Sequence, residues 1–327
     1  MKKTLIALTV AALASTSASA LTVYSENGAT VDVTGAVKMV LQKETNQKAK
    51  INKKDAKLGI KAKYDFGTDA YALAAYEYSF LEPKVKKAYI GVGSASAGQL
   101  TFGLQNTFAD GVGQSTFDNA FGALSRFIPG DSDDMISYRY TGLENWSFGA
   151  DYILKKDVSQ ADMDKAVKDV NDQIATGDIS DLFGKAFKLA TLGDDFVSVG
   201  AQYDANNLTA GFAYAHAEET NLVDAGFAYK LDDVKLGLDL GYSKVGDLKG
   251  FYVSPGVKVS LGDAAVYGTY SYTKFKFDDV STKLHGFNLG AEYTLAKNAL
   301  IFVEGNYIKV KDKDSVKAIG VGMKVEW

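Results

Sequence analysis

The sequence has no cysteine and only two histidines, His216 and His285, among its 327 residues. Without cysteines it forms neither disulfides nor thiolate metal sites, and its histidines are not clustered as metal ligands would be. A general base is usually a histidine beside an acid or a serine, whereas His216 ends one expected strand and His285 begins another beside aromatic residues. We therefore expect no enzyme, no metal and no cofactor. The DSDD stretch at 131–134 is more typical of a solvated turn than of a calcium site.

Long apolar runs are also missing. The apolar run Leu5–Leu13 falls short of the roughly 20 residues that a transmembrane helix needs. Two lysines precede this run and Ala18-Ser19-Ala20 follows it as a small-x-small cleavage site, so residues 1–20 are predicted to be a secretory signal peptide. The mature chain, 21–327, is expected to form a single domain. An exported chain without a spanning helix is either soluble or crosses a membrane as strands.

Excess positive charge is absent as well. The formal charge is −4, and it becomes about −6 once Lys2 and Lys3 are removed, so no nucleic-acid partner is expected. A hydrophobic content of 46% is ordinary for a soluble domain, but the chain holds 19 tyrosines, 18 phenylalanines and 32 glycines. Such averages also suit a β-barrel whose strands face lipid on one side and water on the other.

Apolar residues alternate with polar residues along most of the mature chain. Between Val234 and Ser243 the even positions are all apolar, while the odd positions hold lysine, glycine, aspartate, glycine and serine. Strands with one apolar side produce this period of two. We count about sixteen such stretches from Thr30 to Trp327, joined by connections that alternate between short and long, as in outer-membrane barrels. The longer connections include residues 43–55 and 274–283. The sequence therefore predicts an all-β fold, a sixteen-stranded antiparallel transmembrane β-barrel.

Two long segments interrupt this alternation. Residues 106–134 contain four glycines and four phenylalanines, and the phenylalanines indicate that this loop packs against something, which we expect to be the inside of the barrel. Residues 155–195 form the other long external loop. Within it, apolar residues at helical spacing after Asp157 are compatible with a helix near the outer mouth or with a variable surface loop.

Short motifs throughout the mature chain resemble one family. They are LTVYSENGATVDVTGAVK at 21–38, DAKLGIKAKYDFG at 55–67, AYEYSF at 75–80, KKAYIGVG at 86–93, FYVSPG at 251–256 and VGMKVEW at 321–327. The chain is similar to the trimeric general diffusion porins of Gram-negative outer membranes, especially the Pasteurella-type porins. The resemblance implies a homotrimer in contact with outer-membrane lipid and lipopolysaccharide. It also implies a third loop folded inward and passive, weakly selective diffusion of ions and small hydrophilic solutes.

The resemblance also implies a pore constriction with charges on two sides. Loop acids Asp110 and Asp118 match its acidic side, and Lys38, Lys57 and Lys87 match its basic side. Weaker matches are Glu77, Arg126 and Arg139. The loop lacks the PEFGGD stretch of enterobacterial members, and lysine stands where arginine is common there. We expect subunit contacts on the lipid-facing side of the first and last strands, and the family pattern further implies that Leu81–Val85 contacts a neighbouring subunit.

The residues support an inward lysine row on physical grounds. Lys57, Lys61 and Lys63 share one strand face, and a lysine facing mid-bilayer would cost about 2–4 kcal/mol, so this face must line the lumen. Opposed rows of acid and base create a transverse field that favours polar solutes. The net charge favours cations and the lysines favour anions, so we expect weak selectivity with a slight preference for cations. A substrate-selective channel, for sugars for example, is the alternative, although inward Tyr71 and Tyr89 form no continuous aromatic track.

Overall fold

The computed structural model describes residues 20–67, 69–122, 126–154, 195–277 and 280–327, together with positions 161, 164, 165 and 168. The predicted signal peptide lies outside the described residues except for Ala20. The segment with helical spacing after Asp157 also lies outside them, except that the four isolated positions are helical. Among the described residues, no helix is long and apolar enough to cross a membrane.

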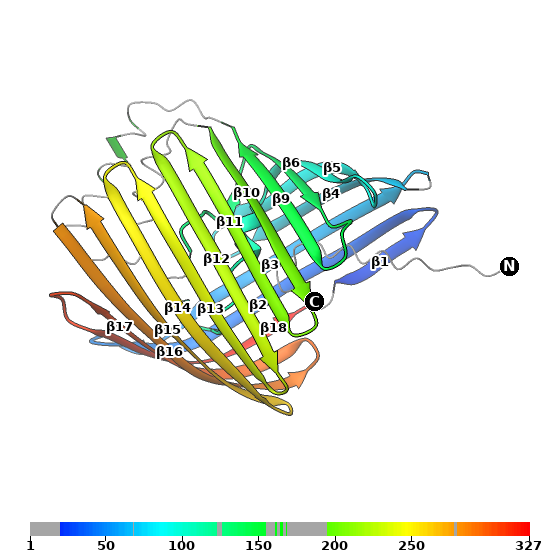
Figure 1. Cartoon of the computed structure of the whole chain (residues 1–327). Helices are drawn as coiled ribbons and strands as arrows, with labels where there is room; N and C mark the ends of the chain where they lie inside the picture. The colour runs from blue at the N-terminus through cyan, green and yellow to red at the C-terminus, as the bar shows by residue number, and fades with distance from the viewer. Residues whose placement is uncertain are drawn as a thin grey trace.

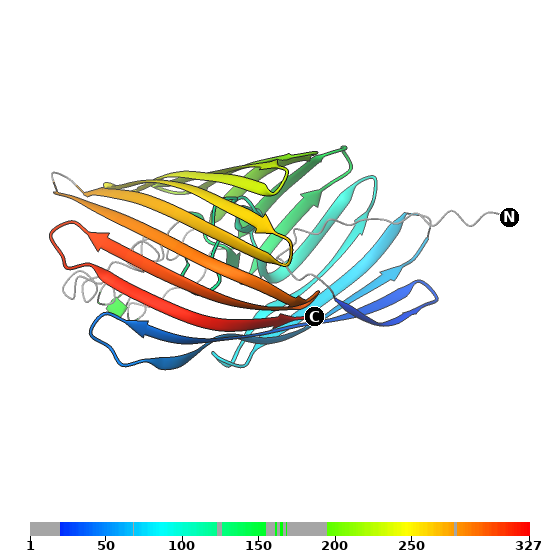
Figure 2. The ribbon, with the colours of Figure 1, turned by 90° about the horizontal axis from the view of Figure 1, so that it is seen from below.

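Sixteen antiparallel strands form a closed barrel, with consecutive barrel strands paired along the chain (Figure 1). Pairing between β18 and β2 closes the ring, and Figure 2 shows the red end of the chain beside the blue beginning. The barrel strands are β2 (Ala29–Glu44), β3 (Lys50–Asp65), β4 (Ala70–Ser79), β5 (Lys84–Ser94), β6 (Gly98–Asn106), β8 (Met135–Tyr140), β9 (Trp146–Ile153), β10 (Phe196–Ala205), β11 (Leu208–Ala217), β12 (Thr220–Leu231), β13 (Val234–Val245), β14 (Leu248–Leu261), β15 (Ala264–Phe277), β16 (Val280–Ala296), β17 (Ala299–Val310) and β18 (Val316–Glu326).

The alternation in the sequence becomes an outward and an inward face. On β13 the side chains of Leu236 and Tyr242 are exposed on the outside, whereas Asp239 and Ser243 are fully buried on the inside. The same outward apolar exposure recurs around the wall, from Ile60 on β3 to Val321 on β18. An apolar outer surface with every strand edge paired is what a lipid bilayer requires of a spanning structure.

The first strand, β1 (Leu21–Glu26), was not predicted from the sequence. It pairs with the beginning of β2, while β18 pairs with the remainder of β2, so β1 and β18 both lie along this one strand. The terminal residue Trp327 fixes this junction, because its amide donates to the Gly35 carbonyl at 2.9 Å and its carbonyl accepts from the Gly35 amide at 2.6 Å. All six residues of β1 are exposed, so no buried face marks this strand in the sequence.

Several strands extend further toward the long-loop rim than their apolar patterns indicate. Residues 43–55 and 274–283 were expected to be loops, but β3 begins at Lys50 and β15 continues to Phe277. Both expectations are wrong. The lysines in these segments interrupt the alternation of apolar residues, but the hydrogen bonds between neighbouring strands continue through them. The connections at the other rim are short, such as 206–207 between β10 and β11 and 262–263 between β14 and β15.

Candidate functional site

The segment between β6 and β8, which we call the inner loop (106–122 and 126–134), lies against the buried polar face of the wall. It begins with a short 3₁₀ helix, Phe108–Gly111, and includes β7 (Asp131–Ser132), a two-residue strand that pairs with the end of β6. Sequence analysis did not predict β7. The wall residues that the loop contacts alternate with exposed apolar residues of the outer surface, so the loop runs inside the barrel.

Buried carboxylates of the wall bind the loop backbone in the order in which the loop passes them. On β9, Asp151 accepts the Phe108 amide at 2.7 Å. On β13, Asp239 accepts the amides of Gln114 and Ser115 at 2.6 and 2.9 Å. Carboxylates are strong acceptors for backbone amides, so each contact holds the loop more firmly than a neutral hydrogen bond would.

Residues 119–121 of the loop are bound by β17, and residues 127 and 128 are bound by β12. Glu304 accepts the Asn119 amide at 2.6 Å and the Phe121 amide at 2.8 Å, and the Tyr267 hydroxyl donates to it at 2.7 Å. Asp224 accepts the amides of Phe127 and Ile128, with the closest contact at 2.8 Å, and the hydroxyl of Tyr252 at 2.9 Å. The loop is therefore an arch that crosses the wall from β9 to β17 and comes back to β12.

A row of inward glycines makes room for this arch on adjacent strands. A Cβ atom at Gly226 would overlap the Val112 carbonyl, and one at Gly256 would overlap the Ser115 carbonyl. The row consists of Gly149, Gly200, Gly211, Gly226, Gly237 and Gly256 on β9 to β14, and a Cβ at each would meet the loop within 3.4 Å. At Gly226, Gly237 and Gly256 glycine is required because the backbone of the loop touches the wall. At Gly149 and Gly200 the Phe108 ring occupies the space that a Cβ would need.

Apolar side chains of the loop provide the buried core of the molecule. Phe108, Val112 and Ile128 are about 1% exposed and pack with wall residues that include Phe196 and Leu222. The prediction that the loop's phenylalanines pack against something is confirmed for Phe108 and Phe127. Burying several such side chains, each contributing about 1.5–3 kcal/mol, reinforces the carboxylate contacts.

Opposite the arch, the inner face of β2 to β5 carries lysines. The register places Lys57 and Lys61 on either side of Gly59 on β3, and Gly59 lies opposite Glu77 of β4, which in turn lies opposite Lys87 of β5. Lys57 forms an ion pair with Asp55 at 3.5 Å, and Lys87 forms one with Glu77 at 3.9 Å. Among the described residues, no acid lies within ion-pair distance of Lys38 or Lys61.

The two predicted loop acids have different surroundings. Asp110 forms an ion pair with Arg126 and accepts from Asn106 Nδ2 at 2.5 Å, so it braces the loop internally. Asp118 lies between the Glu304 anchor and the lysine wall. Burial, and after it the Glu304 carboxylate, raise the pKa of the Asp118 carboxyl to about 6, although Lys38 opposes both effects. Asp118 therefore interacts electrostatically with Lys38 of the lysine wall, and Asp110 interacts with Lys87.

Arg139 is engaged in the framework of the loop. Its guanidinium binds Asp151 at 2.6 Å, donates to the Asn106 carbonyl at 3.3 Å and lies 5.5 Å from the centre of the Phe108 ring. Both histidines lie on the outer face, where His285 contacts the Tyr270 hydroxyl at 2.8 Å and His216 contacts Asn221 at 3.2 Å. The residues that the structure describes hold no cluster of three or more potential metal ligands.

Sequence analysis missed the carboxylates that anchor the loop. Asp151, Asp224, Asp239 and Glu304 are each at most 3% exposed. A signal was available, because each is a lone acid on the inward face of a predicted strand and ionisable groups at membrane depth need a partner. The inward glycines on neighbouring strands pointed to the same region of the wall.

A closed barrel with an apolar exterior and an internal loop fastened by buried carboxylates defines a channel-forming barrel of the outer membrane. The family model for Gram-negative porins matches residues 7–313, so the chain belongs to the Gram-negative porin family and forms an outer-membrane pore for diffusion.

Relatives and solved structures agree with this assignment. A major outer membrane protein of Pasteurella multocida is 30% identical over 360 residues and the match covers all of both chains. Among solved structures, OmpT of Vibrio cholerae has a TM-score of 0.74 at 15% identity and covers 94% of this chain and 99% of its own. An anion-selective porin from Comamonas acidovorans has a TM-score of 0.67 at 15% identity, covering 91% of this chain and 100% of its own. The predicted family, fold class and outer-membrane location are thereby confirmed.

Proposed function

We propose that ions and small hydrophilic solutes pass through the aperture between the inner loop and the lysines of β2 to β5, and that this aperture is the constriction of the pore. The proposal rests on which strands hold the loop by hydrogen bonds. Its hydrogen bonds to wall acids go to β9, β12, β13 and β17, which carry none of these lysines. The space in front of the lysines is therefore the path left for water.

Charges on the two sides of this path act differently on a passing ion. Asp118 contributes negative charge from the loop, whereas Lys38, Lys57, Lys61 and Lys87 contribute positive charge from the wall. Asp110 contributes little net charge, because Arg126 neutralises it within the loop. The opposed charges orient polar solutes and leave weak selectivity, since ions screen more distant charges over about 8–10 Å.

Neutralising one charge on each side tests the constriction. We would measure single-channel conductance and reversal potential in planar bilayers under a salt gradient. Asp118→Asn should move the reversal potential toward anion preference, and Lys38→Gln should move it toward cation preference. Asp232→Asn is the matched control, because Asp232 lies in a short turn at the opposite rim with a φ of 46° that asparagine adopts readily. If Asp118→Asn and Lys38→Gln both behave like this control, the constriction lies elsewhere.

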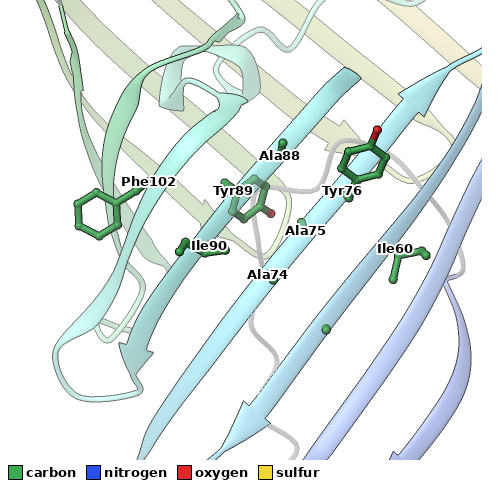
Figure 3. Close-up of a pocket in the computed structure, with 9 residues that line it drawn as sticks. Ile60, Ala74, Ala75, Tyr76, Ala88, Tyr89, Ile90 and Phe102 are labelled. Carbon is green, nitrogen blue, oxygen red and sulfur yellow. The ribbon is translucent and has the colours of Figure 1, made fainter. Parts of the chain in front are cut away.

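We also propose that the protein assembles as a homotrimer through the outer face of β3 to β6. One solved relative in fold is described as a trimer form of OmpT from Vibrio cholerae. On this chain, small residues leave an apolar hollow of about 550 Å³ on that face, lined by Ile60, Ala62, Ala74, Tyr76, Ala88, Ile90 and Phe102 (Figure 3). A second copy would fill this hollow, and the expected contact of Leu81–Val85 with a neighbour lies at the connection between β4 and β5.

A large side chain in the hollow tests this assembly. Ala74→Trp should convert trimers to smaller species, whereas Ala225→Trp, on the outer face of β12, should leave the trimer intact. Light scattering of the protein in detergent measures the mass directly. Trimers that persist in Ala74→Trp would place the interface on another face.

We propose no catalytic step and no cofactor for this transport, because the solute gradient drives diffusion. A sugar-selective channel is less well supported, since two large inner tyrosines, Tyr252 and Tyr267, bind the loop anchors Asp224 and Glu304. We also propose that the exposed apolar outer face contacts outer-membrane lipid and lipopolysaccharide.

A further inference from the structure

The inner face of β4 and β5 carries an apolar patch between the Glu77–Lys87 ion pair and the short turns. Four residues form it, and we call them the inner patch: Tyr71, Leu73, Ala75 and Tyr89. They alternate along their strands with residues that are exposed on the lipid side, such as Tyr76 and Ile90, so their side chains face the lumen. The interior of a water-filled barrel is polar as a rule, so apolar side chains at this place indicate a specific role.

The inner loop does not account for this patch. Other inward apolar residues, such as Leu222 and Phe302, pack with residues of the loop, whereas the two buried clusters that the described residues form include no member of the inner patch. A neighbouring glycine agrees with this, because a Cβ atom at Gly93 would meet the Tyr71 ring at 2.6 Å, while those on β9 to β14 would meet the loop. The patch therefore borders the lumen.

One positive charge beside the inner patch lacks a partner. Lys63 forms an ion pair with Asp65 at 2.7 Å, and Lys87 forms one with Glu77 at 3.9 Å. Lys61 of β3 forms neither an ion pair nor a side-chain hydrogen bond with any residue that the structure describes. One surplus positive charge remains, and a singly charged anion would neutralise it.

The strand register places this charge near an aromatic ring. Lys61 lies opposite Ala75, and Ala75 lies opposite Tyr89. The backbones of Lys61 and Tyr89 are therefore two strands apart, about 10 Å, with only the methyl group of Ala75 between their side chains. On the other side, Tyr89 lies opposite Gly103, so both residues directly opposite the tyrosine are small.

The two tyrosines of the patch have different surroundings. The ring of Tyr71 lies against Gly93, the Lys63 ammonium lies 4.6 Å from its centre, and its hydroxyl donates to Gln99 at 3.4 Å. Tyr89 is only half-buried, and its hydroxyl has no hydrogen-bond partner in the described part of the chain. Tyr71 is thus fixed as part of the wall, and Tyr89 is the ring that can pack against a solute.

We propose that the inner patch and Lys61 bind small aromatic carboxylates on their way through the pore. Leu73, Ala75 and Tyr89 contact the aromatic ring of the solute, and Lys61 binds its carboxylate. Packing against a tyrosine and a charge-assisted contact together favour molecules that carry both groups. The site requires an open lumen, but it does not depend on where the constriction lies.

Benzoate is the probe for this site, with acetate as a carboxylate that has no ring and benzyl alcohol as a ring that has no charge. Each compound is added to single channels in planar bilayers, and the frequency and duration of current interruptions give its dissociation constant. The variants are Tyr89→Ala and Lys61→Gln, each with a conservative counterpart, Tyr89→Phe and Lys61→Arg.

Lys235→Gln is the matched control. Lys235 also lies beside an aromatic ring, 5.7 Å from the centre of Phe117, and its half-buried side chain alternates with the exposed Leu236, so it faces the lumen. It is on β13, eight strands from β4 in the ring of sixteen, so it removes the same charge from the opposite wall.

Benzoate should interrupt the wild-type current at lower concentrations than acetate or benzyl alcohol. Tyr89→Ala should raise the benzoate dissociation constant about three- to tenfold, because the aromatic packing is lost. Lys61→Gln should raise it about two- to fivefold, because the ion pair is lost. Tyr89→Phe, Lys61→Arg and Lys235→Gln should remain close to wild type.

Four results would overturn the proposal. They are wild-type channels that benzoate does not interrupt, unchanged benzoate binding in Tyr89→Ala or in Lys61→Gln, equal binding of acetate and benzoate, and loss of benzoate binding in Lys235→Gln. The last result would place the site on the opposite wall. Open-channel conductance is recorded before each addition, so failure of this site is distinguishable from failure of the pore.

Discussion

Replacing Glu304 by glutamine tests whether the carboxylate of this residue holds the inner loop against the wall. The side chain keeps its size, but one of its two acceptor oxygens becomes an NH₂ group that faces backbone amides. The carboxylate now accepts the amides of Asn119 and Phe121 at 2.6 and 2.8 Å, through different oxygens. The variant keeps one of these bonds at most, and it leaves the other amide buried without an acceptor.

The magnitude follows from that lost bond. A hydrogen bond to a charged group contributes about 1.5–3 kcal/mol, and an unsatisfied buried amide costs about 1–3 kcal/mol, with overlap between the two terms. We therefore expect Glu304→Gln to weaken the seating of residues 118–122 by about 2–4 kcal/mol. This change increases the detached population roughly 30- to 1,000-fold. The other carboxylate anchors are unchanged, so the barrel should still form.

Two measurements report the effect. Single-channel recordings should show added current fluctuations, because the detached segment moves in the aperture. The reversal potential should also change its pH dependence, since Glu304 raises the pKa of Asp118 and removal of its charge lowers that pKa from about 6. The reasoning is refuted if the variant shows no added current fluctuations and if its reversal potential changes with pH at the same pH as in wild type. Glu304 would then be neither an anchor of the loop nor an electrostatic neighbour of Asp118.

Three further predictions concern the loop and its wall. In wild type, Asp118 becomes protonated as the pH falls through about 6, so the reversal potential should move toward anions there, and Asp118→Asn should show no such step. Gly226→Ala should destabilise the protein by about 1–3 kcal/mol and alter conductance, because the added Cβ overlaps the Val112 carbonyl. Gly305→Ala is the control and should change neither property, because no atom lies closer than 3.9 Å to its added Cβ. Equal thermal denaturation midpoints for the two variants would contradict this prediction. Arg126→Gln should shift the reversal potential toward cations by freeing the charge of Asp110, and adding Asp110→Asn should reverse the shift; no shift in the single variant would show that this pair lies outside the field of the aperture.

The barrel could be predicted from the sequence because its determinants are local. Each strand must present apolar residues to lipid at every second position, as β13 does between Val234 and Ser243, and this constraint is visible without any partner strand. Strand residues that do not follow this alternation were not predicted. The lysine-rich beginning of β3 and the exposed β1 continue the backbone ladder beyond the apolar band, so their side chains carry no regular pattern.

The fastening of the loop could not be predicted in the same way. Asp239 and Ser115 are 124 positions apart, and Glu304 and Asn119 are 185 apart. A lone acid on an inward face gives the same pattern whether it binds water or a distant backbone amide. Asp110 and Arg126, 16 positions apart within the loop, were both named from the sequence as lining the pore, but which residues pair depends on how the loop folds.

Closure of the ring at the junction of β2 and β18 has a consequence for how the molecule folds. Ala36 pairs with Glu326, about 290 positions later in the chain, so this ladder joins segments that are very far apart in the sequence. Closing a flexible loop of that length costs about 5 kcal/mol of chain entropy by the logarithmic relation. Until β18 arrives, the growing sheet has two unpaired edges that are open to other chains. Pairing of β18 with β2 therefore ends the period in which the protein is most prone to aggregate, and a variant that lacks the last residues of β18 should refold slowly and with losses.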